Sequence, residues 1–337
     1  MWRVTARVRR RKNWCGFSHM RQSIAALAIA LWSTALHAQY PDKPIRVVVP
    51  WPPGGGVDIA ARTVQPGLTE GLRQTLVIDN RPGAGGSIGS AQVAKMAPDG
   101  YTLLIASSST HAVAPVLYKN IPYDPIRDFA PVSFIETKPY VLVVHPSLPA
   151  KSAAELISVA RVAKTPLTMA SAGTGSSNHL VGELFQMLTG VKFIHVPYRG
   201  TAPAGLAVIS GEADLQIDQV APALPNISSG RLRALAITTE KRSPQLPNIP
   251  TMRESGVSGG EATGYTALVA PAGTPVAALE RLNAVLVGVL RSRNIVERFA
   301  SQGSESAPST PDQVTQKFKD DLAKWARVVA KAGVRVE

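Results

Sequence analysis

The chain has 337 residues, enough for about two domains, and its 36 Lys and Arg against 23 Asp and Glu give a formal net charge of +13. Seven of these cations lie before residue 22, which leaves 29 cations against 23 anions in the rest of the chain. The remaining lysines and arginines are scattered singly and are not interleaved with aromatic residues, a pattern that excludes a nucleic-acid surface. The small positive excess of charge favours small anionic ligands. The one cysteine, Cys15, lies in the basic segment, so the rest of the chain has no disulfide, thiolate nucleophile or cysteine metal ligand.

The first 38 residues have the organisation of a secretory signal peptide. A basic start precedes an apolar run from Ile24 to Trp32, and small residues follow up to Ala38. Since the run is too short to span a bilayer comfortably, we expect cleavage after Ala38 and export of the rest of the chain. The sequence from Met20 would itself begin an ordinary signal peptide, so we hypothesise that translation starts there. An altered Met20 codon that left precursor size and export unchanged would disprove this.

Strands and helices then alternate. The β-branched run 45–49 predicts a buried strand, which the prolines and glycines of 50–56 end before a helix begins near Asp58. In chain order we expect further strands at 75–79, 101–106, 140–144, 167–170, 192–196, 214–217, 232–238 and 265–270. We expect helices at 87–96, 152–162, 180–188, 203–210, 276–291 and 310–332, one more that ends near residue 230, and a surface loop at 121–131. This alternation predicts an α/β fold with mostly parallel sheets and helices on their faces.

Three strand–turn–helix junctions, at 51–58, 81–89 and 173–179, share one chemistry. Each offers backbone N–H groups beside a helix N-terminus, which carries a positive partial charge. The third adds the hydroxyls of Thr174, Ser176 and Ser177. Such donors hold a carboxylate without a buried cation, although glycine turns also simply connect the elements of α/β folds.

Other residues admit both a functional and a structural interpretation. Trp51, Tyr198 and Tyr265 either wall a ligand site or belong to the core. Asp218 follows a strand, where it either accepts a hydrogen bond from a ligand or caps the next helix. His179 and His195 are expected to be structural, and the histidine spacing gives no support for a metal site.

One motif suggests a different class of protein. Residues 85–89, GGSIG, fit the G-x-S-x-G nucleophile elbow of hydrolases, with Ser87 as the nucleophile. The match lies in a glycine-biased turn, where chance produces it easily. A secreted serine hydrolase is therefore the alternative to a binding protein, and replacing Ser87 by alanine separates the two, because only a hydrolase has turnover to lose.

Taken together, the motifs resemble the Bug (TctC) family, the substrate-binding proteins of tripartite tricarboxylate transporters. The resemblance covers essentially the whole chain after the leader, and it lies in the segments 40–45 (YPDKPI), 53–58 (PGGGVD), 80–86 (NRPGAGG), 98–103 (PDGYTL), 117–118, 122–125, 128–129, 175–180, 195–200 (HVPYRG) and 270–275 (APAGTP). The chain departs from the family pattern at Ala114, Ala207 and Tyr265, where the family usually has asparagine, aspartate and tryptophan.

The resemblance implies a two-lobed periplasmic binding protein of type 2, non-enzymatic and monomeric, with the ligand cleft between the lobes and no cofactor or metal. It implies a first lobe of residues 39–140 and 264–337 and a second lobe of 141–263. A small organic carboxylate would be delivered to membrane permease subunits, or presented to a receptor as a sensor would do. The implied ligand contacts are Trp51, Gly55, Gly56, Asp58, Ala84, Gly85, Gly86 and Ser107 in the first lobe, and Thr174, Ser176, Ser177, Tyr198 and Asp218 in the second.

Overall fold

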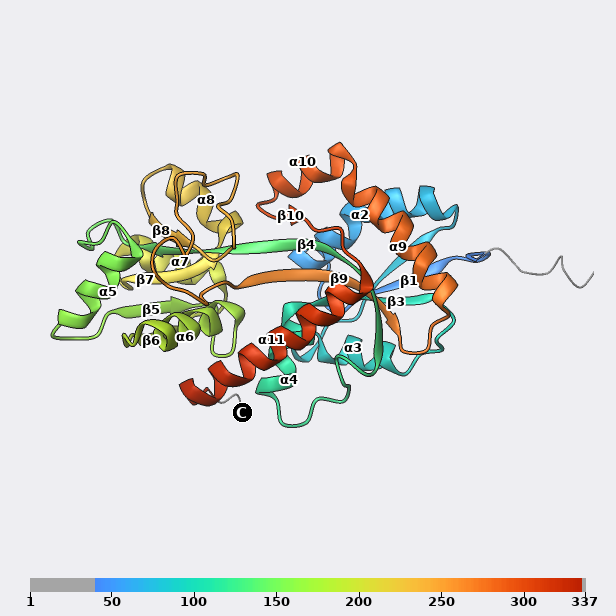
Figure 1. Cartoon of the computed structure of the whole chain (residues 1–337), viewed down its shortest axis with the longest axis horizontal. Coiled ribbons are helices and arrows are strands. Elements are labelled where there is room, and N and C mark those ends of the chain that lie inside the picture. Colours follow the sequence, from blue (N-terminus) through green and yellow to red (C-terminus); the bar gives the residue numbers. More distant parts are fainter. Residues whose placement is uncertain (1–39, 335–337) are drawn as a thin grey trace, which may run out of the picture. The chain divides into compact units, whose positions relative to one another are not determined.

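The computed structural model describes residues 40–334 (Figure 1). The chain divides into residues 1–42 and a second unit that begins at Lys43, and this second unit contains the strands and helices from β1 to α11. The expected signal peptide, 1–38, lies outside the described residues. No helix between residues 40 and 334 combines the length and the apolar character that a bilayer-crossing segment needs.

The first sheet is built around β1 (Ile45–Val49), which pairs in parallel with β2 (Leu76–Asn80) and β3 (Thr102–Ser107). β9 (Thr263–Pro271) lies antiparallel between β3 and the first part of β4 (Phe129–Val144). The short β10 (Glu305–Ser306) also pairs with β4. Apart from β9 and β10, the strands of this sheet run in one direction.

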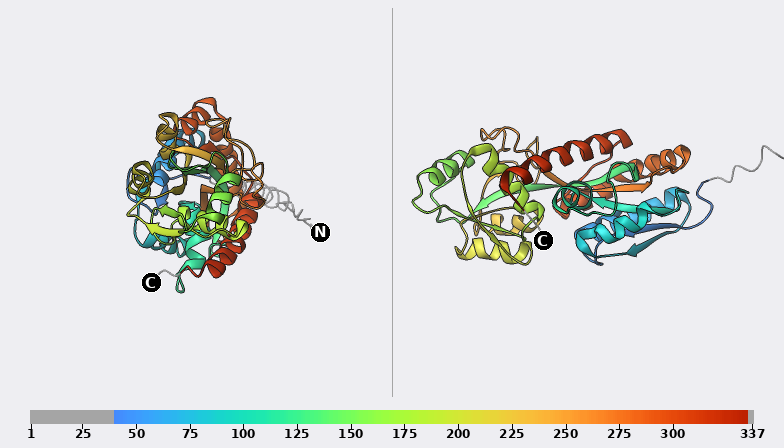
Figure 2. Two further views of the ribbon diagram at one scale, coloured as in Figure 1. Left: turned by 90° about the vertical axis from the view of Figure 1, so that its left-hand side faces the viewer. Right: turned by 90° about the horizontal axis from the view of Figure 1, so that it is seen from below.

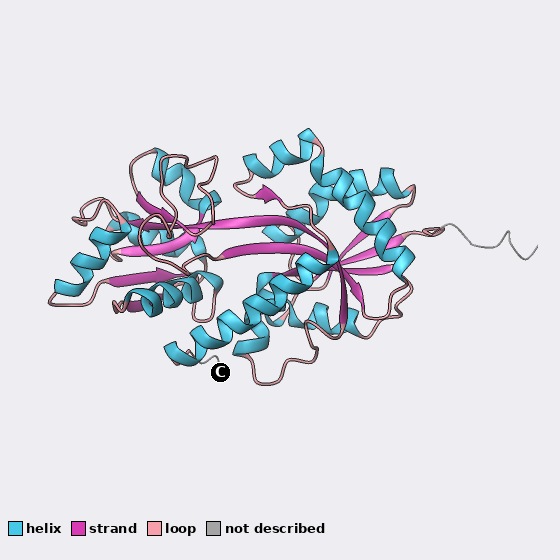
Figure 3. Ribbon diagram, viewed as in Figure 1, coloured by secondary structure: helices cyan, strands magenta, loops and turns pink. Residues whose placement is uncertain are grey.

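The second sheet begins where β4 passes on to new partners. The last part of β4, 140–144, pairs antiparallel with β7 (Leu215–Gln219) and β8 (Arg233–Ile237). Parallel pairs then add β5 (Thr168–Ser171) and β6 (Ile194–Pro197). β4 is therefore the strand that belongs to both sheets, and it crosses between two groups of helices (Figure 3).

Helices cover both sheets. Those around the first sheet are α2 (Gly56–Leu72), η1 (Ala84–Gly86), α3 (Ser87–Ala94), the π-helix η2 (Ser109–Val113), α4 (Ala114–Leu117), α9 (Val276–Arg291) and α10 (Arg293–Ser301). Those around the second are α5 (Ala153–Val162), α6 (Ser177–Thr189), α7 (Thr201–Ser210) and α8 (Val220–Ser228). We call the elements around the first and second sheets the first and second lobe.

The last helix, α11 (Pro311–Ala332), packs against both lobes. Phe318 belongs to the core of the first lobe, together with Phe134 and Tyr265. Trp325 and Val328, further along the helix, belong to another core cluster, which combines residues of α5, α6 and β7 with Ala112 and Val113 of η2. Figure 2 shows α11, in red, extending from the one group of elements to the other. The helix that the expected bounds place in the first lobe therefore also packs against elements of the second.

Most expected elements are present to within two residues, and the differences cluster after β3. The expected loop 121–131 ends early, because β4 begins at Phe129 rather than at residue 140. The prolines and aspartates of 121–131 suggested a loop, and proline has no N–H to donate to a sheet. The register shift at Pro131/Ser133 accommodates Pro131 inside the strand. The elements η2, α4, α10 and β10 were not expected.

Candidate functional site

A cavity of about 480 Å³ lies where the carboxyl ends of the parallel strands of both lobes face one another. Its first-lobe wall comes from the segments after β1, β2 and β3, which contribute Trp51, Gly85, Ser109, Val113, Ala114, Leu117 and Tyr118. Its second-lobe wall comes from the segments after β5, β6 and β7, and contains residues 172–178, Thr201 and Gln219. Ligands of open α/β sheets bind at such strand ends, which makes this cavity the candidate site.

A larger hollow of about 790 Å³ between α2, α9 and α10 is a weaker candidate. It lies beside the helices rather than at the ends of the parallel strands. Its wall includes Gly67 and Gly71, where a Cβ would come within 3.0 Å of Val289 or Val285. Those glycines are explained by close packing between α2 and α9, without a ligand.

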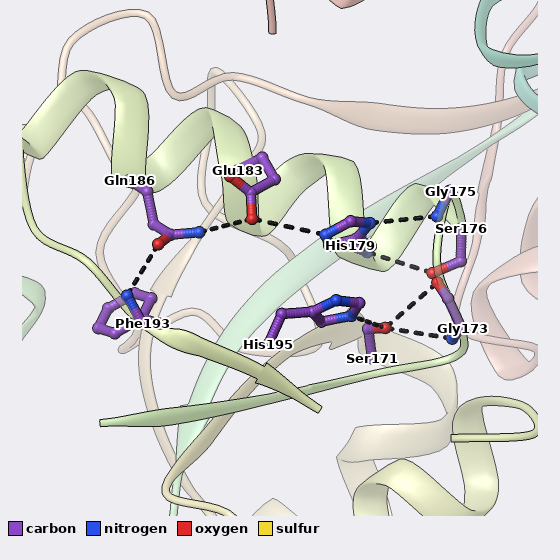
Figure 4. A network of polar contacts seen from close by, with 9 residues as sticks. All are labelled: Ser171, Gly173, Gly175, Ser176, His179, Glu183, Gln186, Phe193 and His195. Carbon is purple, nitrogen blue, oxygen red and sulfur yellow. Dashed lines mark hydrogen bonds and ion pairs between the residues drawn. The ribbon is translucent and has the colours of Figure 1, made fainter. Parts of the chain in front are cut away.

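The second-lobe loop 172–176 is fixed by a polar network around two histidines (Figure 4). The backbone N–H of Gly175 donates to Nδ1 of His179 at 3.1 Å, and Nε2 of His179 lies 3.5 Å from a carboxylate oxygen of Glu183. Ser176 is the N-cap of α6, and its hydroxyl accepts from the backbone N–H of His179. Nδ1 of His179 is thus the acceptor that holds the loop, and its Nε2 faces the Glu183 carboxylate.

His195 stacks on His179 with the ring centroids 3.7 Å apart. Its Nε2 lies 2.6 Å from the hydroxyl of Ser171, which also accepts from the backbone N–H of Gly173. Burial and the neighbouring His179 lower the pKa of His195 to about 4, so this ring is neutral near pH 7. Both histidines position the loop that lines the cavity, in agreement with a structural role.

Asp218 lies behind the cavity wall rather than in it. Its carboxylate accepts from Nδ2 of Asn178 at 3.2 Å and from the backbone N–H of Gln219 at 2.7 Å, and both of these residues line the cavity. Asp218 is 4% exposed, and burial raises its pKa to about 7. The two hydrogen bonds favour the ionised form and lower the pKa, but by less than burial raises it. Tyr140, whose hydroxyl interacts with Ser177 and Gln219, adds to the same polar cluster.

On the first-lobe side, Trp51 packs over the glycine turn of η1. A Cβ on Gly86 would lie 2.6 Å from Cγ2 of Thr110 and 3.4 Å from the Trp51 ring. The positive φ of Gly86, 92°, also favours glycine. The indole Nε1 of Trp51 is buried and has no hydrogen-bond partner within residues 40–334. This turn therefore requires glycine for close packing and leaves one indole donor available.

Asp58 connects the turn after β1 to the end of β2 through hydrogen bonds. Its carboxylate accepts from the backbone N–H of Gly54, from Nδ2 of Asn80 and from Nε of Arg62, each at 2.8–2.9 Å. Burial opposes its ionisation, but these hydrogen bonds outweigh burial and lower its pKa. All of these contacts are internal, so Asp58 positions the turn and does not line the cavity.

Five of the thirteen expected contact residues line the cavity together: Trp51, Gly85, Thr174, Ser176 and Ser177. The other eight lie outside its lining: Gly55, Gly56, Asp58, Ala84, Gly86, Ser107, Tyr198 and Asp218. The hydroxyl of Ser107 interacts with Thr110, and that of Tyr198 donates to Glu212. Tyr265, one of the aromatic residues considered for a ligand wall, is buried in the core between Phe134 and Phe318.

The lining also contains residues that the sequence did not single out. Asn178 and Thr201 lie in the first turns of α6 and α7, and Gln219 is the N-cap of α8. Each of these helices follows a parallel strand, and that position was the available signal. Ser109, Val113, Leu117 and Tyr118 were not among the expected contacts, because the helical turns after β3 were not expected. Their apolar members, Val113 and Leu117, resemble ordinary core residues in sequence.

The hydrolase alternative finds no support in the geometry. Ser87 begins α3 with a relaxed helical φ of −66°, unlike the strained elbow of hydrolases. Its hydroxyl is buried beside Tyr123 and, within the described chain, has no hydrogen bond to a histidine that could activate it. Among residues 40–334, no group of three or more His, Cys, Asp or Glu side chains is placed to hold a metal ion.

Comparisons with known proteins agree with this picture. The profile described as "Tripartite tricarboxylate transporter family receptor" (TctC) matches residues 60–334. Protein BugT of Bordetella pertussis is 38% identical over 325 residues, which cover 95% of this chain and all of BugT. Two solved structures are also similar. "R. palustris Rpa4515 with adipate" is 36% identical, with a TM-score of 0.74 over 88% of this chain and 99% of that one. MatC from Rhodopseudomonas palustris with bound malate is 32% identical, with a TM-score of 0.70 over 86% and 100%.

Proposed function

Because the chain belongs to the tripartite tricarboxylate transporter receptor (TctC) family, we propose that it closes over a small organic carboxylate in the cavity between its lobes and delivers it to the membrane subunits of such a transporter. The observation that carries the proposal is the convergence of six strand-end segments on one cavity. Three of these segments begin helices whose N-termini suit an anion. Adipate and malate in two similar structures support a carboxylate as the ligand class.

Family membership confirms several expectations. The chain was expected to be a Bug-family protein with a two-lobed α/β fold and the role of a periplasmic solute receptor rather than an enzyme. The matched family and its solved relatives have this fold and this role. The finer points are part of our proposal. They are a monomer, hinge crossings near Tyr140 and Thr263, and cleavage after Ala38, which N-terminal sequencing of the exported protein checks.

The proposed contacts combine the thirteen expected residues with the observed lining. Thr174, Ser176, Ser177 and Thr201 supply hydroxyls on the second-lobe side, while Trp51 and Gly85 face them from the first lobe. Asp58, Gly86 and Asp218 contribute by holding the lining residues in place. A ligand that contacts both lobes stabilises the closed state, because its affinity for that state exceeds its affinity for the open one.

A thermal-shift screen of organic acids on the protein purified after export tests the proposal. A ligand at a hundred times its Kd adds about 2.7 kcal/mol of stability, which is readily measured as a rise in Tm. Ser177→Leu, in the cavity wall, is expected to weaken binding of the best acid at least tenfold. Ser158→Leu, at an exposed position on α5, serves as the matched control and should bind normally. If no organic acid raises the Tm, the proposal is wrong.

A further inference from the structure

The side chains that line the cavity are all neutral. Within the described chain, its wall contains no lysine, arginine, histidine, aspartate or glutamate. Lys138, which approaches Gly56 in the first turn, is paired with the buried Glu136 at 2.9 Å, so its charge is offset. A negatively charged ligand group can therefore be held only by N–H and O–H donors, and several of them must converge on each carboxylate.

Those donors gather on the second-lobe wall. Helices α6, α7 and α8, each of nine or more residues, begin at this wall, and Ser177 and Thr201 stand in their first turns. Thr174 and Ser176 add hydroxyls from the loop that the two histidines hold in place. The combined positive ends of three helices and four hydroxyls suffice for one carboxylate.

The opposite wall is mainly apolar. Val113, Ala114 and Leu117 come from the consecutive helical turns η2 and α4, and the ring of Trp51 lies on the same side. Val113 and Ala114 are only 5% and 4% exposed. A second carboxylate placed here would lose its hydration and meet only the hydroxyls of Ser109 and Tyr118 and the Trp51 indole N–H, which are fewer side-chain donors than the second-lobe wall offers.

A buried acidic group also opposes additional negative charge. Asp218 lies directly behind Asn178 and Gln219, and in its ionised form it repels an anion in the cavity. The facing titratable groups on other elements are Tyr140 of β4 and, beyond it, Asp321 of α11. Asp321 forms an ion pair with Lys317, so the charge of that lysine is already neutralised. None of these facing groups is therefore a cation that could neutralise the charge of Asp218.

We propose that the ligand is a monocarboxylate, with its carboxylate at the N-termini of α6, α7 and α8 and an aliphatic or aromatic body against Val113, Ala114 and Leu117. This inference rests on the proposed function and names the class of carboxylate. It differs from the dicarboxylates, adipate and malate, that two similar structures contain. Leu117 and Ala114 are then the specificity-determining residues, because they place apolar surface opposite the donors of the second-lobe wall.

Titration calorimetry with hexanoate, adipate and hexan-1-ol, at pH 7 on the protein purified after export, tests the inference. Hexanoate and adipate share a six-carbon chain and differ by one carboxylate. We expect hexanoate to bind at least tenfold more tightly than adipate, and hexan-1-ol to bind at least tenfold more weakly than hexanoate. Equal or tighter binding of adipate overturns the inference but leaves the proposed function intact, as does binding of citrate without hexanoate. Failure of every organic acid removes the proposed function as well.

Two variants locate the apolar body. Leu117→Asn is expected to weaken hexanoate about tenfold and to leave adipate unchanged or improved, because it adds a donor and removes apolar contact. Ala114→Asn makes the same change at a smaller side chain and remains informative if Leu117→Asn folds poorly. Leu206→Asn, at a 62% exposed position on α7 outside the cavity, is the matched control. Unchanged hexanoate affinity in both cavity variants overturns the placement.

Discussion

Replacing Asp218 by asparagine should change how the stability of the protein depends on pH. Burial raises the pKa of this carboxyl from its usual 3.8 to about 7. The folded state therefore holds a proton that the unfolded state releases between these values, and stability falls as pH rises through that window. Each pKa unit corresponds to about 1.4 kcal/mol, so the cost is about 1.6 kcal/mol at pH 5 and about 4 kcal/mol at pH 8.

Asp218→Asn removes the ionisation while its Oδ1 can still accept from Asn178 and Gln219. Urea unfolding of both proteins at several pH values from 5 to 8 measures the difference. The variant should gain about 2 to 3 kcal/mol relative to the natural protein between pH 5 and pH 8. Stability curves that run parallel over this range would show that the carboxyl is ionised in the folded protein, and the reasoning from burial would be refuted.

Two further predictions concern the glycine turn and the helix that follows it. Gly86→Ala should lower the free energy of unfolding by about 2 to 4 kcal/mol in urea unfolding, because its Cβ would meet Thr110 at 2.6 Å and its φ is positive. Gly85→Ala also has a positive φ but open space around its Cβ, so it should cost about 1 kcal/mol in the same measurement. Equal losses would contradict the steric argument. Ser87→Ala should leave stability unchanged or slightly raised, because the buried hydroxyl has no partner, while Ser90→Ala loses a 3.0 Å hydrogen bond to Gly86 and should cost about 1 kcal/mol. A clear loss in Ser87→Ala would reveal a contact that this reasoning lacks.

The sequence predicted the general location of the site because each strand–turn–helix junction is a local pattern. The turn after β1 and the loop after β5 were expected from consecutive glycines, prolines and hydroxyls, and both contribute to the cavity. Thr174, Ser176 and Ser177, which were expected to contact the ligand, line this cavity, because the N-cap of a helix fixes where short polar side chains point.

Several individual roles were beyond sequence reasoning because they depend on partners far along the chain. Asp58 was expected to contact the ligand, yet its carboxylate is bound by Asn80, 22 residues away. Asp218 is turned toward Asn178, 40 residues away, and Tyr198 donates to Glu212. A side chain at a strand end can face the ligand or the neighbouring element, and only the packing of that element selects between them.

The sequence by itself determined the order of strands and helices and the presence of glycine turns at helix N-termini, because hydrophobic periodicity, proline and glycine act within a few residues. The tertiary structure alone decided that six strand ends meet at one cavity and that η2 and α4 form its apolar wall. It also decided that α11 packs on both lobes. These features arise from contacts between distant segments, where burial and hydrogen bonding choose among side-chain orientations that the local sequence leaves equally open.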